Sequence, residues 1–295
     1  MKILLATDGS AYSEEAAKFL TCLRFAPQDN IYLFHVVTQI PYEDEYHKQV
    51  LHFIKRYSPA ILQSCADSIA STSARIIKEE QEGIPEDEIV KRAQARGVDL
   101  IVMGARGIKG ITSLFLGSVT RAVAIQADRP LLVTKPHQEN ICRPLRILFA
   151  TDGSDSAQAT AHLLSRMPFM QGSELTIMNI AWSSFASIPD RYAVEVNDMM
   201  KNELAKIRMM ESERAEKVID KAKAQLAERF SPVHALIKGG DATEVVLKTA
   251  EEMQADLIAV GSRGIKGRKG MLGSVARRIL DRAKCSVLIG KEGAR

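Results

Sequence analysis

The sequence predicts an α/β protein built from two tandem, doubly wound domains. Two observations support this prediction. One set of sequence patterns occurs twice along the 295 residues, and within each copy short apolar runs alternate with helical patterns. Apolar runs of about four to eight residues, separated by helices, are typical of a parallel sheet that helices cover on both faces. Right-handed crossovers between such strands then produce a doubly wound sheet in each copy.

The duplication is visible in three ordered pairs of matching segments. The run ILLATDGS at residues 3–10 matches ILFATDGS at residues 147–154. Further along the chain, VDLIVMGARGIKG matches ADLIAVGSRGIKG, and LGSVTRAV matches LGSVARRI. Self-similarity at three places in the same order indicates a tandem duplication. We therefore predict a first domain over residues 1–137, a proline-containing linker over residues 138–144 and a second domain over residues 145–295.

Each copy contains five apolar runs that we interpret as strands. In the first copy they are residues 2–7, 31–37, 73–79, 99–104 and 130–135. In the second copy they are residues 146–151, 175–181, 233–239, 256–261 and 286–291. The last run of each copy is expected to pair with the other, because each then covers an edge that would otherwise stay exposed.

The second copy also contains one long segment, residues 193–230, whose apolar side chains recur at helical spacing. This period predicts a single extended amphipathic helix. Four methionines lie in it, Met199, Met200, Met209 and Met210. We interpret them as side chains that pack in the core or between the domains, in preference to a surface for a protein partner.

Composition excludes several classes of protein. Hydrophobic residues make up 46% of the chain and charged residues 26%, which is typical of a soluble globular protein. The apolar start of the chain runs directly into an Asp-Gly turn, so we interpret it as a buried strand and not as a secretory signal. No apolar run approaches the roughly 18 residues of a membrane span. These patterns predict a cytoplasmic protein with no membrane partner.

The formal charge of +4 and the lack of a long basic block give no reason to expect a nucleic-acid partner. The four cysteines, Cys22, Cys65, Cys142 and Cys285, are scattered, and we interpret them as buried structural thiols. The histidines have no metal-ligand spacing, so no protein-held metal site is expected.

The chemistry lies in a glycine-spaced loop that follows a predicted strand in each copy. Between Gly104 and Ser118 the spacing is G-x2-G-x9-G-S. Glycines in such a loop permit positive φ and let a ligand approach the backbone closely. Because a helical run begins at its end, Ser118 is expected to be the N-cap, and the free N–H groups of the first turn suit phosphate oxygens.

A Gly-Ser pair before a helix is often only a cap. Two such loops, each accompanied by an aspartate at the end of the copy's first strand, favour a ligand site instead. Neither loop has the G-x4-G-K-[ST] spacing of a P-loop or the G-x-G-x2-G spacing of a nicotinamide-binding turn.

On these residues the chain resembles a tandem universal stress protein, and the match covers nearly all of both copies. The G-x2-G-x9-G-[ST] loop with an upstream strand-end aspartate is that family's ATP-binding signature. The resemblance implies a five-stranded parallel sheet of order 3-2-1-4-5 in each domain, with domains paired through their last strands. It places ATP, or AMP or ADP, across the ends of the first and fourth strands, with Mg²⁺ held through the phosphates.

The resemblance also assigns roles to matching positions. In the first domain, Asp8 lies near the adenosine, the backbone of Val36 reads the adenine edge, and a set around the loop holds ribose and phosphates. The first-domain residues are Thr7, Asp8, Val36, Met103, Gly104, Arg106, Gly107, Gly117, Ser118 and Val119. The second-domain residues are Asp152, Ile180, Val260, Gly261, Gly264, Gly273, Ser274 and Val275.

The second copy departs from the signature at two places. Its loop reads G-x2-G-x8-G-S, one residue short, and Asn179 replaces His35. The shorter loop could narrow a phosphate pocket, while Lys266, Arg268 and Lys269 would favour a polyphosphate. Loop residues Arg106 and Arg263 either contact phosphate or remain solvated. We expect nucleotide in the first domain and leave the second open.

Catalysis requires more than this loop contains. ATP hydrolysis needs a positioned water, a base and usually a metal near the γ-phosphate. Neither loop contains a carboxylate or a histidine. We therefore expect no catalytic residues and a stress-response regulatory protein that binds nucleotide. A slow ATP hydrolase of the same fold and an interaction module with vestigial pockets remain as alternatives. A homodimer of the whole chain and an unidentified protein partner are left open.

Overall fold

The computed structural model describes residues 1–39, 45–107, 116–136, 143–181, 198–265 and 271–292. The strands of the first half are β1 (Lys2–Ala6), β2 (Asn30–Thr38), β3 (Arg75–Gly83), β4 (Leu100–Gly104) and β5 (Leu131–Thr134). Its helices are α1 (Ala11–Thr21), α2 (Glu45–Ser68), α3 (Pro85–Arg96) and α4 (Ser118–Gln126). Strand and helix alternate along the chain, as the sequence predicts.

The second half repeats this order. Its strands are β6 (Arg146–Ala150), β7 (Glu174–Ala181), β8 (Val233–Gly239), β9 (Leu257–Gly261) and β10 (Ser286–Gly290). Its helices are α5 (Asp155–Arg166), α6 (Asp198–Leu226), α7 (Ala242–Glu252) and α8 (Ser274–Arg282). Each predicted strand run overlaps an observed strand, but β3 begins two residues later and ends four residues later than the predicted run 73–79. The predicted long helix is confirmed as α6, which ends four residues before the predicted end at residue 230, while residues 193–197 of that prediction lie outside the described residues.

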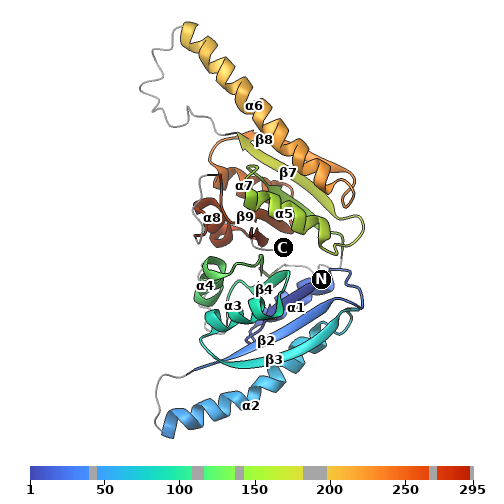
Figure 1. Cartoon of the computed structure of the whole chain (residues 1–295), viewed down its shortest axis with the longest axis vertical. Coiled ribbons are helices and arrows are strands. Elements are labelled where there is room, and N and C mark those ends of the chain that lie inside the picture. Colours follow the sequence, from blue (N-terminus) through green and yellow to red (C-terminus); the bar gives the residue numbers. More distant parts are fainter. Residues whose placement is uncertain (40–44, 108–115, 137–142, 182–197, 266–270, 293–295) are drawn as a thin grey trace.

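In the described part of the chain, the ten strands form one sheet of order β3-β2-β1-β4-β5-β10-β9-β6-β7-β8. The order within each half is therefore 3-2-1-4-5, counted from that half's own first strand. Neighbours within a half are parallel, and β5 and β10 join the halves in antiparallel register, with Leu132 opposite Leu288. The two halves meet at the middle of an elongated molecule, with β3 and β8 at its outer edges (Figure 1).

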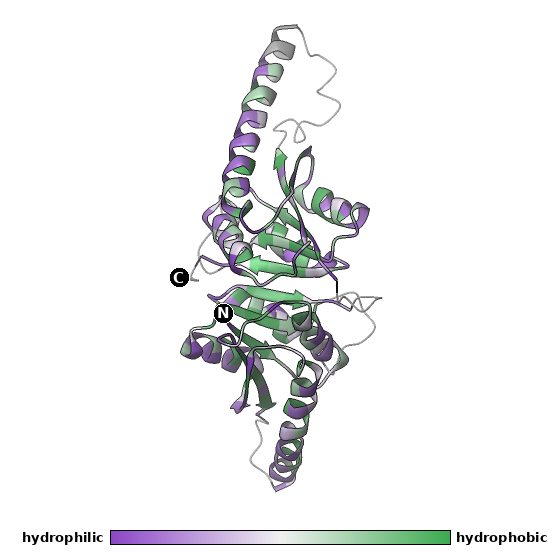
Figure 2. Cartoon of the chain, turned by 90° about the vertical axis from the view of Figure 1, so that its right-hand side faces the viewer, coloured by the Kyte–Doolittle hydropathy of each residue, from purple (hydrophilic) through white to green (hydrophobic). Residues whose placement is uncertain are grey.

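Two apolar layers lie on the two faces of the sheet. Side chains alternate along a strand, so in β1 Leu5 packs against α1 and α2 whereas Leu4 packs against the face of α3 and α4. The second half has the same arrangement with α5 and α6 on one face and α7 and α8 on the other. The central strands are the most apolar part of the molecule (Figure 2).

The edge strands differ from the predicted fully covered sheet. The residues of β3 and β8 are largely exposed or half-buried, unlike the buried residues of β4 and β10. In β3 the run Lys78–Glu82 is mostly charged, and charges on an edge strand discourage pairing with another chain.

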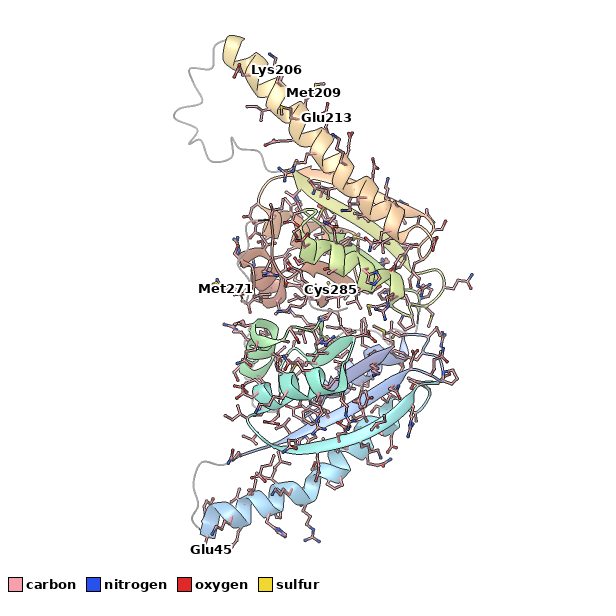
Figure 3. The ribbon with its side chains drawn as sticks, in the orientation of Figure 1. Glu45, Lys206, Met209, Glu213, Met271 and Cys285 are labelled. Carbon is pink, nitrogen blue, oxygen red and sulfur yellow. The ribbon has the colours of Figure 1, made fainter. Side chains whose placement is uncertain are left out.

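Helices α2 and α6 are longer than the sheet they cover and extend beyond it at opposite ends of the molecule (Figure 1). Met209 lies on the extending part of α6 (Figure 3), and Met209 and the adjacent Met210 are 65% and 69% exposed. The interpretation of these two methionines as core or domain-pairing residues is therefore wrong. The side chains of Met199 and Met200 lie outside the described residues.

The predicted structural thiols are confirmed where they are described. Cys22, Cys65 and Cys285 are buried thiols that are not in disulfides, and Cys142 lies outside the described residues. Burial raises the pKa of Cys65 to about 11 and that of Cys285 to about 12, so both stay protonated at neutral pH. Among the described helices, none combines the length and apolarity needed to cross a membrane.

Two lysines that follow β5 and β10 form hydrogen bonds between the two halves. Lys135, which follows β5, donates from Nζ to the carbonyl oxygen of Leu280 in α8 at 3.0 Å and also to that of Ala283. Lys291, which follows β10, donates from Nζ to the carbonyl oxygen of Ala124 in α4 at 2.7 Å. Each cation therefore lies at the C-terminal end of a helix of the other half, where the helix dipole favours it.

Burial of these lysines predicts a specific pH dependence of stability. Burial lowers the pKa of Lys291 from 10.5 to about 8, so above pH 8 the folded chain releases a proton that the unfolded chain retains. Stability then rises with pH by up to about 1.4 kcal/mol per unit. From about pH 7.5 to about pH 9.5, the free energy of unfolding measured in urea should increase more for wild type than for Lys291→Met. Lys248→Met, at an exposed lysine, serves as the control. A difference in unfolding free energy between wild type and Lys291→Met that does not change with pH would contradict this account.

Separation of the halves should expose the joining edge. We expect residues 1–137, expressed alone, to dimerise through β5 or to be less stable than the full chain, because Leu131–Thr134 would lose its antiparallel neighbour. Analytical ultracentrifugation and urea unfolding of both separate halves would test this. Monomeric halves as stable as the full chain would show that the β5–β10 pairing contributes nothing.

Candidate functional site

The first strand of each half ends in a tight turn that orients an aspartate. In the first half the N–H of Ser10 donates to Asp8 Oδ1 at 3.0 Å, and Gly9 has φ of +77°. In the second half the N–H of Ser154 donates to Asp152 Oδ1 at 3.0 Å. An aspartate that accepts from the residue two positions later forms an Asx turn, and glycine supplies the left-handed conformation at no steric cost. The remaining oxygen of each carboxylate, Oδ2, faces the glycine loop.

That loop is closed at its two ends. The N–H of Gly117 donates to the carbonyl oxygen of Ala105 at 2.9 Å, and the N–H of Gly273 donates to that of Ser262 at 2.8 Å. The middle of each loop, residues 108–115 and 266–270, lies outside the described residues. The one-residue difference in length and the predicted cations Lys266, Arg268 and Lys269 fall there too.

The helix after the loop begins one residue earlier than predicted. Gly117 is the N-cap, with φ of −63° and ψ of 151°, and its carbonyl oxygen accepts from the N–H of Arg121. Ser118 is the first helical residue, so its prediction as the N-cap is wrong. In the second half Gly273 and Ser274 have the same places at the start of α8.

The start of these two helices differs from the start of their neighbours. Helices α1, α5 and α7 are capped by the side chains of Ser10, Ser154 and Asp241. Helices α4 and α8 have no side-chain cap, because glycine has none to offer. Helix α3 also lacks one, but it begins with Pro85, which has no N–H. The first turns of α4 and α8 therefore present backbone donors at the end of the glycine loop.

The strand-end aspartate and the glycine loop are in contact in both halves. A β-carbon added to Gly107 would overlap the Oδ2 atom of Asp8, and one added to Gly264 would lie 2.9 Å from Asp152 Oδ2. Asp152 Oδ2 also accepts from the N–H of Ile265 at 3.1 Å. The structure thus brings together the predicted aspartate and the second glycine of the motif.

The first glycine of the motif has a packing role that the sequence does not predict, and neither Gly104 nor Gly107 has the predicted positive φ. A β-carbon on Gly104 would lie 2.5 Å from the carbonyl oxygen of Tyr12, and one on Gly261 would lie 2.5 Å from Ser156 Oγ. Tyr12 and Ser156 belong to helices α1 and α5. The absence of a side chain at Gly104 and Gly261 is therefore required by helix packing, with or without a ligand.

The replacement of His35 by Asn179 preserves one hydrogen bond. His35 Nδ1 lies 2.8 Å from the carbonyl oxygen of Thr7, and Asn179 Nδ2 donates to that of Thr151 at 2.7 Å. Since a carbonyl oxygen only accepts, Nδ1 of His35 carries the proton. This departure from the signature therefore leaves the strand end fixed in the same way in both halves.

Half-buried apolar side chains border the site on the face of α4 and α8. Val36 and Val119 pack at the margin of this core in the first half, as Ile180 and Val275 do in the second. Met103 and Val260, at the end of the fourth strand of each half, are almost fully buried. The predicted residues thus combine backbone donors, a carboxylate and an apolar wall at the carboxyl ends of the strands, where open α/β sheets bind ligands.

The two loop arginines are held by side chains that the sequence analysis missed. Arg106 Nη1 donates to the hydroxyl of Tyr12 at 3.1 Å, and its guanidinium lies 5.5 Å from the centre of that ring. Arg263 forms an ion pair with Glu292 at 2.6 Å. Both arginines thus have protein partners, and the pattern around Tyr12 gave no signal for this contact.

The second loop is also tied to α5 by hydroxyls. Ser154 Oγ and Ser156 Oγ both donate to the carbonyl oxygen of Arg263, at 3.0 and 2.5 Å. Tyr12 stands at the position of Ser156 in the first half. In the described part of the chain, no three His, Cys, Asp or Glu side chains are grouped so that they could hold a metal ion.

Comparison with known sequences identifies the family. A sequence model described as the Universal stress protein family matches residues 1–135 and again residues 145–291. The chain belongs to the universal stress protein family. It contains two copies of the family's domain, as the internal duplication predicts.

Relatives of this universal stress protein include shorter chains. Universal stress protein MJ0531 of Methanocaldococcus jannaschii is 32% identical over 138 residues, which are 45% of this chain and 81% of that protein. Universal stress protein YxiE of Bacillus subtilis is 29% identical over 145 residues, which are 45% of this chain and 98% of that protein. Each of these matches corresponds to about half of the present chain.

One solved structure is similar over the whole length. The universal stress protein from Archaeoglobus fulgidus has a TM-score of 0.66 and 24% identity, and the match covers 99% of this chain and 98% of that one. This similarity supports the fold of both halves.

Proposed function

We propose that this universal stress protein binds an adenine nucleotide, with ATP as the expected ligand, in its first half. The phosphates would lie against the first turn of α4 and the glycine loop, from Gly104 to Gly107 and from Gly117 to Val119. Asp8 would bind near the adenosine, and the backbone of Val36 would face the adenine edge. Any Mg²⁺ would be held through the phosphates.

The uncapped start of α4 is the observation that supports this proposal most strongly. Neighbouring α1 satisfies its first turn with Ser10, whereas α4 begins with Gly117 and no capping side chain. Free N–H groups and the positive end of the helix dipole attract phosphate oxygens. Asp8, which contacts Gly107, and half-buried Val36 and Val119 lie at the same edge of the sheet.

The second half is the weaker candidate. Its helix α8 has the same uncapped start, and Ile180 and Val275 supply a similar wall. However, Ser154 and Ser156 hold the backbone of Arg263 against α5, so the loop has less freedom to adjust to a phosphate chain. We propose that the first half binds nucleotide more tightly than the second.

The proposed role is regulatory. A nucleotide bound between the strand ends and α4 would order the glycine loop and shift the surface beside it, which a partner or a second copy could detect. Purified full-length protein should release adenine nucleotide on denaturation, detected by ion-exchange chromatography and absorbance. Protein that releases no nucleotide and also fails to bind added ATP would refute the proposal. Steady multiple turnover of added ATP would instead favour the slow hydrolase.

A further inference from the structure

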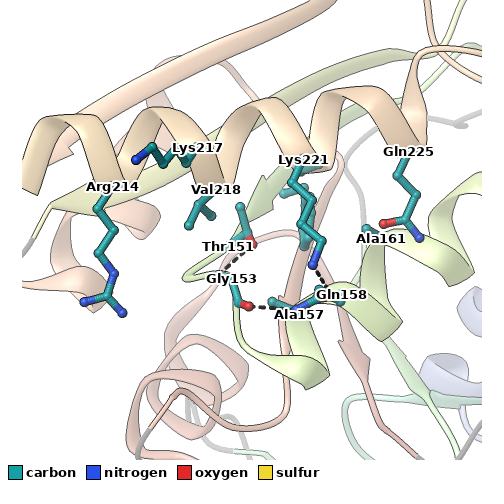
Figure 4. Close-up of a pocket in the computed structure, with 12 residues that line it drawn as sticks. Thr151, Gly153, Ala157, Gln158, Ala161, Arg214, Lys217, Val218, Lys221 and Gln225 are labelled. Carbon is teal, nitrogen blue, oxygen red and sulfur yellow. Dashed lines mark hydrogen bonds between the residues drawn. The ribbon is translucent and has the colours of Figure 1, made fainter.

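A cleft lies on the face of the sheet that α5 and α6 cover. It has a volume of about 240 Å³ and runs between α5 and α6 in the second half (Figure 4). Its floor contains Phe149, Ala157 and Ala161, which belong to the core layer under α5 and α6. Ile180 and Val275 belong to the other layer. The floor of the cleft therefore lies on the opposite face of the sheet from these two side chains, while Thr151 and Gly153, which also line the cleft, flank Asp152.

The rim of this cleft is basic. Arg214, Lys217 and Lys221 of α6 line it, and none of the described lining residues is a carboxylate. Lys221 Nζ donates to Gln158 Oε1 at 2.7 Å, and Gln158 Nε2 donates in turn to the carbonyl oxygen of Gly153 at 3.0 Å (Figure 4). Arg214 and Lys217 are exposed, and no described carboxylate lies within ion-pair distance of either. The cleft thus combines an apolar floor with a positive rim.

The first half lacks this charge pattern at equivalent positions. A β-carbon on Gly9 would meet Ile61 of α2, just as one on Gly153 would meet Val218 of α6, so Ile61 and Val218 correspond. The buried positions of the two helices agree with this alignment, since Leu62 matches Ile219.

Counted from Ile61 and Val218, the three cations of the second half are replaced by uncharged residues. Tyr57, Ala60 and Ser64 stand in the first half where Arg214, Lys217 and Lys221 stand in the second. Counted from Gly9 and Gly153, Glu14 stands where the second half has Gln158. The duplicated fold does not require a basic rim here, because the first half forms the same helix pair without it.

We propose that the cleft between α5 and α6 binds a medium-chain carboxylate, with its alkyl chain on the apolar floor and its carboxylate at Arg214 and Lys217. Opposite charge selects the anionic head, and apolar contact with half-buried Val218 and with Ala222, which line the cleft, binds the chain. The cleft is smaller than the roughly 300 to 1,000 Å³ of drug-sized pockets, which restricts the occupant to a short chain. The proposal does not depend on nucleotide binding.

Calorimetric titration of the full chain with sodium octanoate tests this proposal. We expect saturable binding at one site, no binding of octylammonium, and no competition from ATP. Arg214→Glu combined with Lys217→Glu should weaken octanoate binding by at least about tenfold. Lys206→Glu, on the extending part of the same helix, is the matched control and should bind as wild type does (Figure 3).

Three results would overturn the proposal. The first is the absence of saturable octanoate binding, and the second is equal binding by the double variant and wild type. The third is displacement of octanoate by ATP, which would place octanoate in the nucleotide site. Because both substituted side chains are exposed, the double variant should keep the circular dichroism spectrum and unfolding midpoint of wild type, and these are measured alongside.

Discussion

Replacement of Gly104 by alanine is expected to lower the free energy of unfolding by about 3 kcal/mol. The added β-carbon would lie 2.5 Å from the carbonyl oxygen of Tyr12 and 2.6 Å from its carbonyl carbon. These are backbone atoms in the first turn of α1, so no side-chain rotation can relieve the overlap. Either α1 or β4 would have to shift within a closely packed layer.

Urea unfolding of this variant should be compared with that of two control variants. In Gly239→Ala the new β-carbon meets nothing within 4 Å, and in Gly117→Ala it lies 3.4 Å from the Cα of Arg106, which is an ordinary contact. Gly239→Ala should stay close to wild type, and Gly117→Ala should lose only the roughly 0.5 to 1 kcal/mol that alanine costs at an N-cap. If Gly104→Ala is as stable as Gly239→Ala, the assignment of Gly104 to helix packing is wrong.

The largest expected effect on ligand binding comes from Gly117→Glu. Glutamate at the N-cap would put a carboxylate beside the free N–H groups of α4, where the helix dipole stabilises it. The helix should therefore remain folded while the carboxylate takes the place of the phosphates and repels them. We expect the affinity for ATP to fall by at least about 100-fold, which corresponds to roughly 2.8 kcal/mol.

Calorimetric titration at fixed salt concentration measures this effect. Gly117→Ala is the matched control, because it adds a side chain at the same position without a charge, and it should bind ATP within a few-fold of wild type. If Gly117→Glu binds ATP as tightly as wild type does, the nucleotide lies away from the start of α4.

The fold could be predicted from the sequence to a large extent because its signals are local or repeated. The central strands are short apolar runs, and two copies of each pattern reinforce one another. The exposed edges β3 and β8 were harder to anticipate, because exposure depends on a strand's place in the sheet and not on its own residues. The exposure of Met209 and Met210 could not be predicted for the same reason. These residues are exposed because α6 extends beyond the edge of the sheet.

The site was predicted in part. The contact between Asp8 and Gly107 follows from two motifs at neighbouring strand ends. The N-cap was misplaced because serine is a preferred cap, whereas the backbone bond from Arg121 to Gly117 defines the helix start. The bonds of Lys135 and Lys291 join residues far apart in the sequence, and no local pattern indicates such partners.

The central claim is that the first turn of α4 and the glycine loop hold the phosphates of a nucleotide. The most direct measurement is a backbone amide NMR titration of the full chain with ATP. The account predicts that the amide resonances of Ser118, Val119 and Gly107 shift most and reach saturation together. Saturating ATP that leaves these resonances unmoved would contradict it.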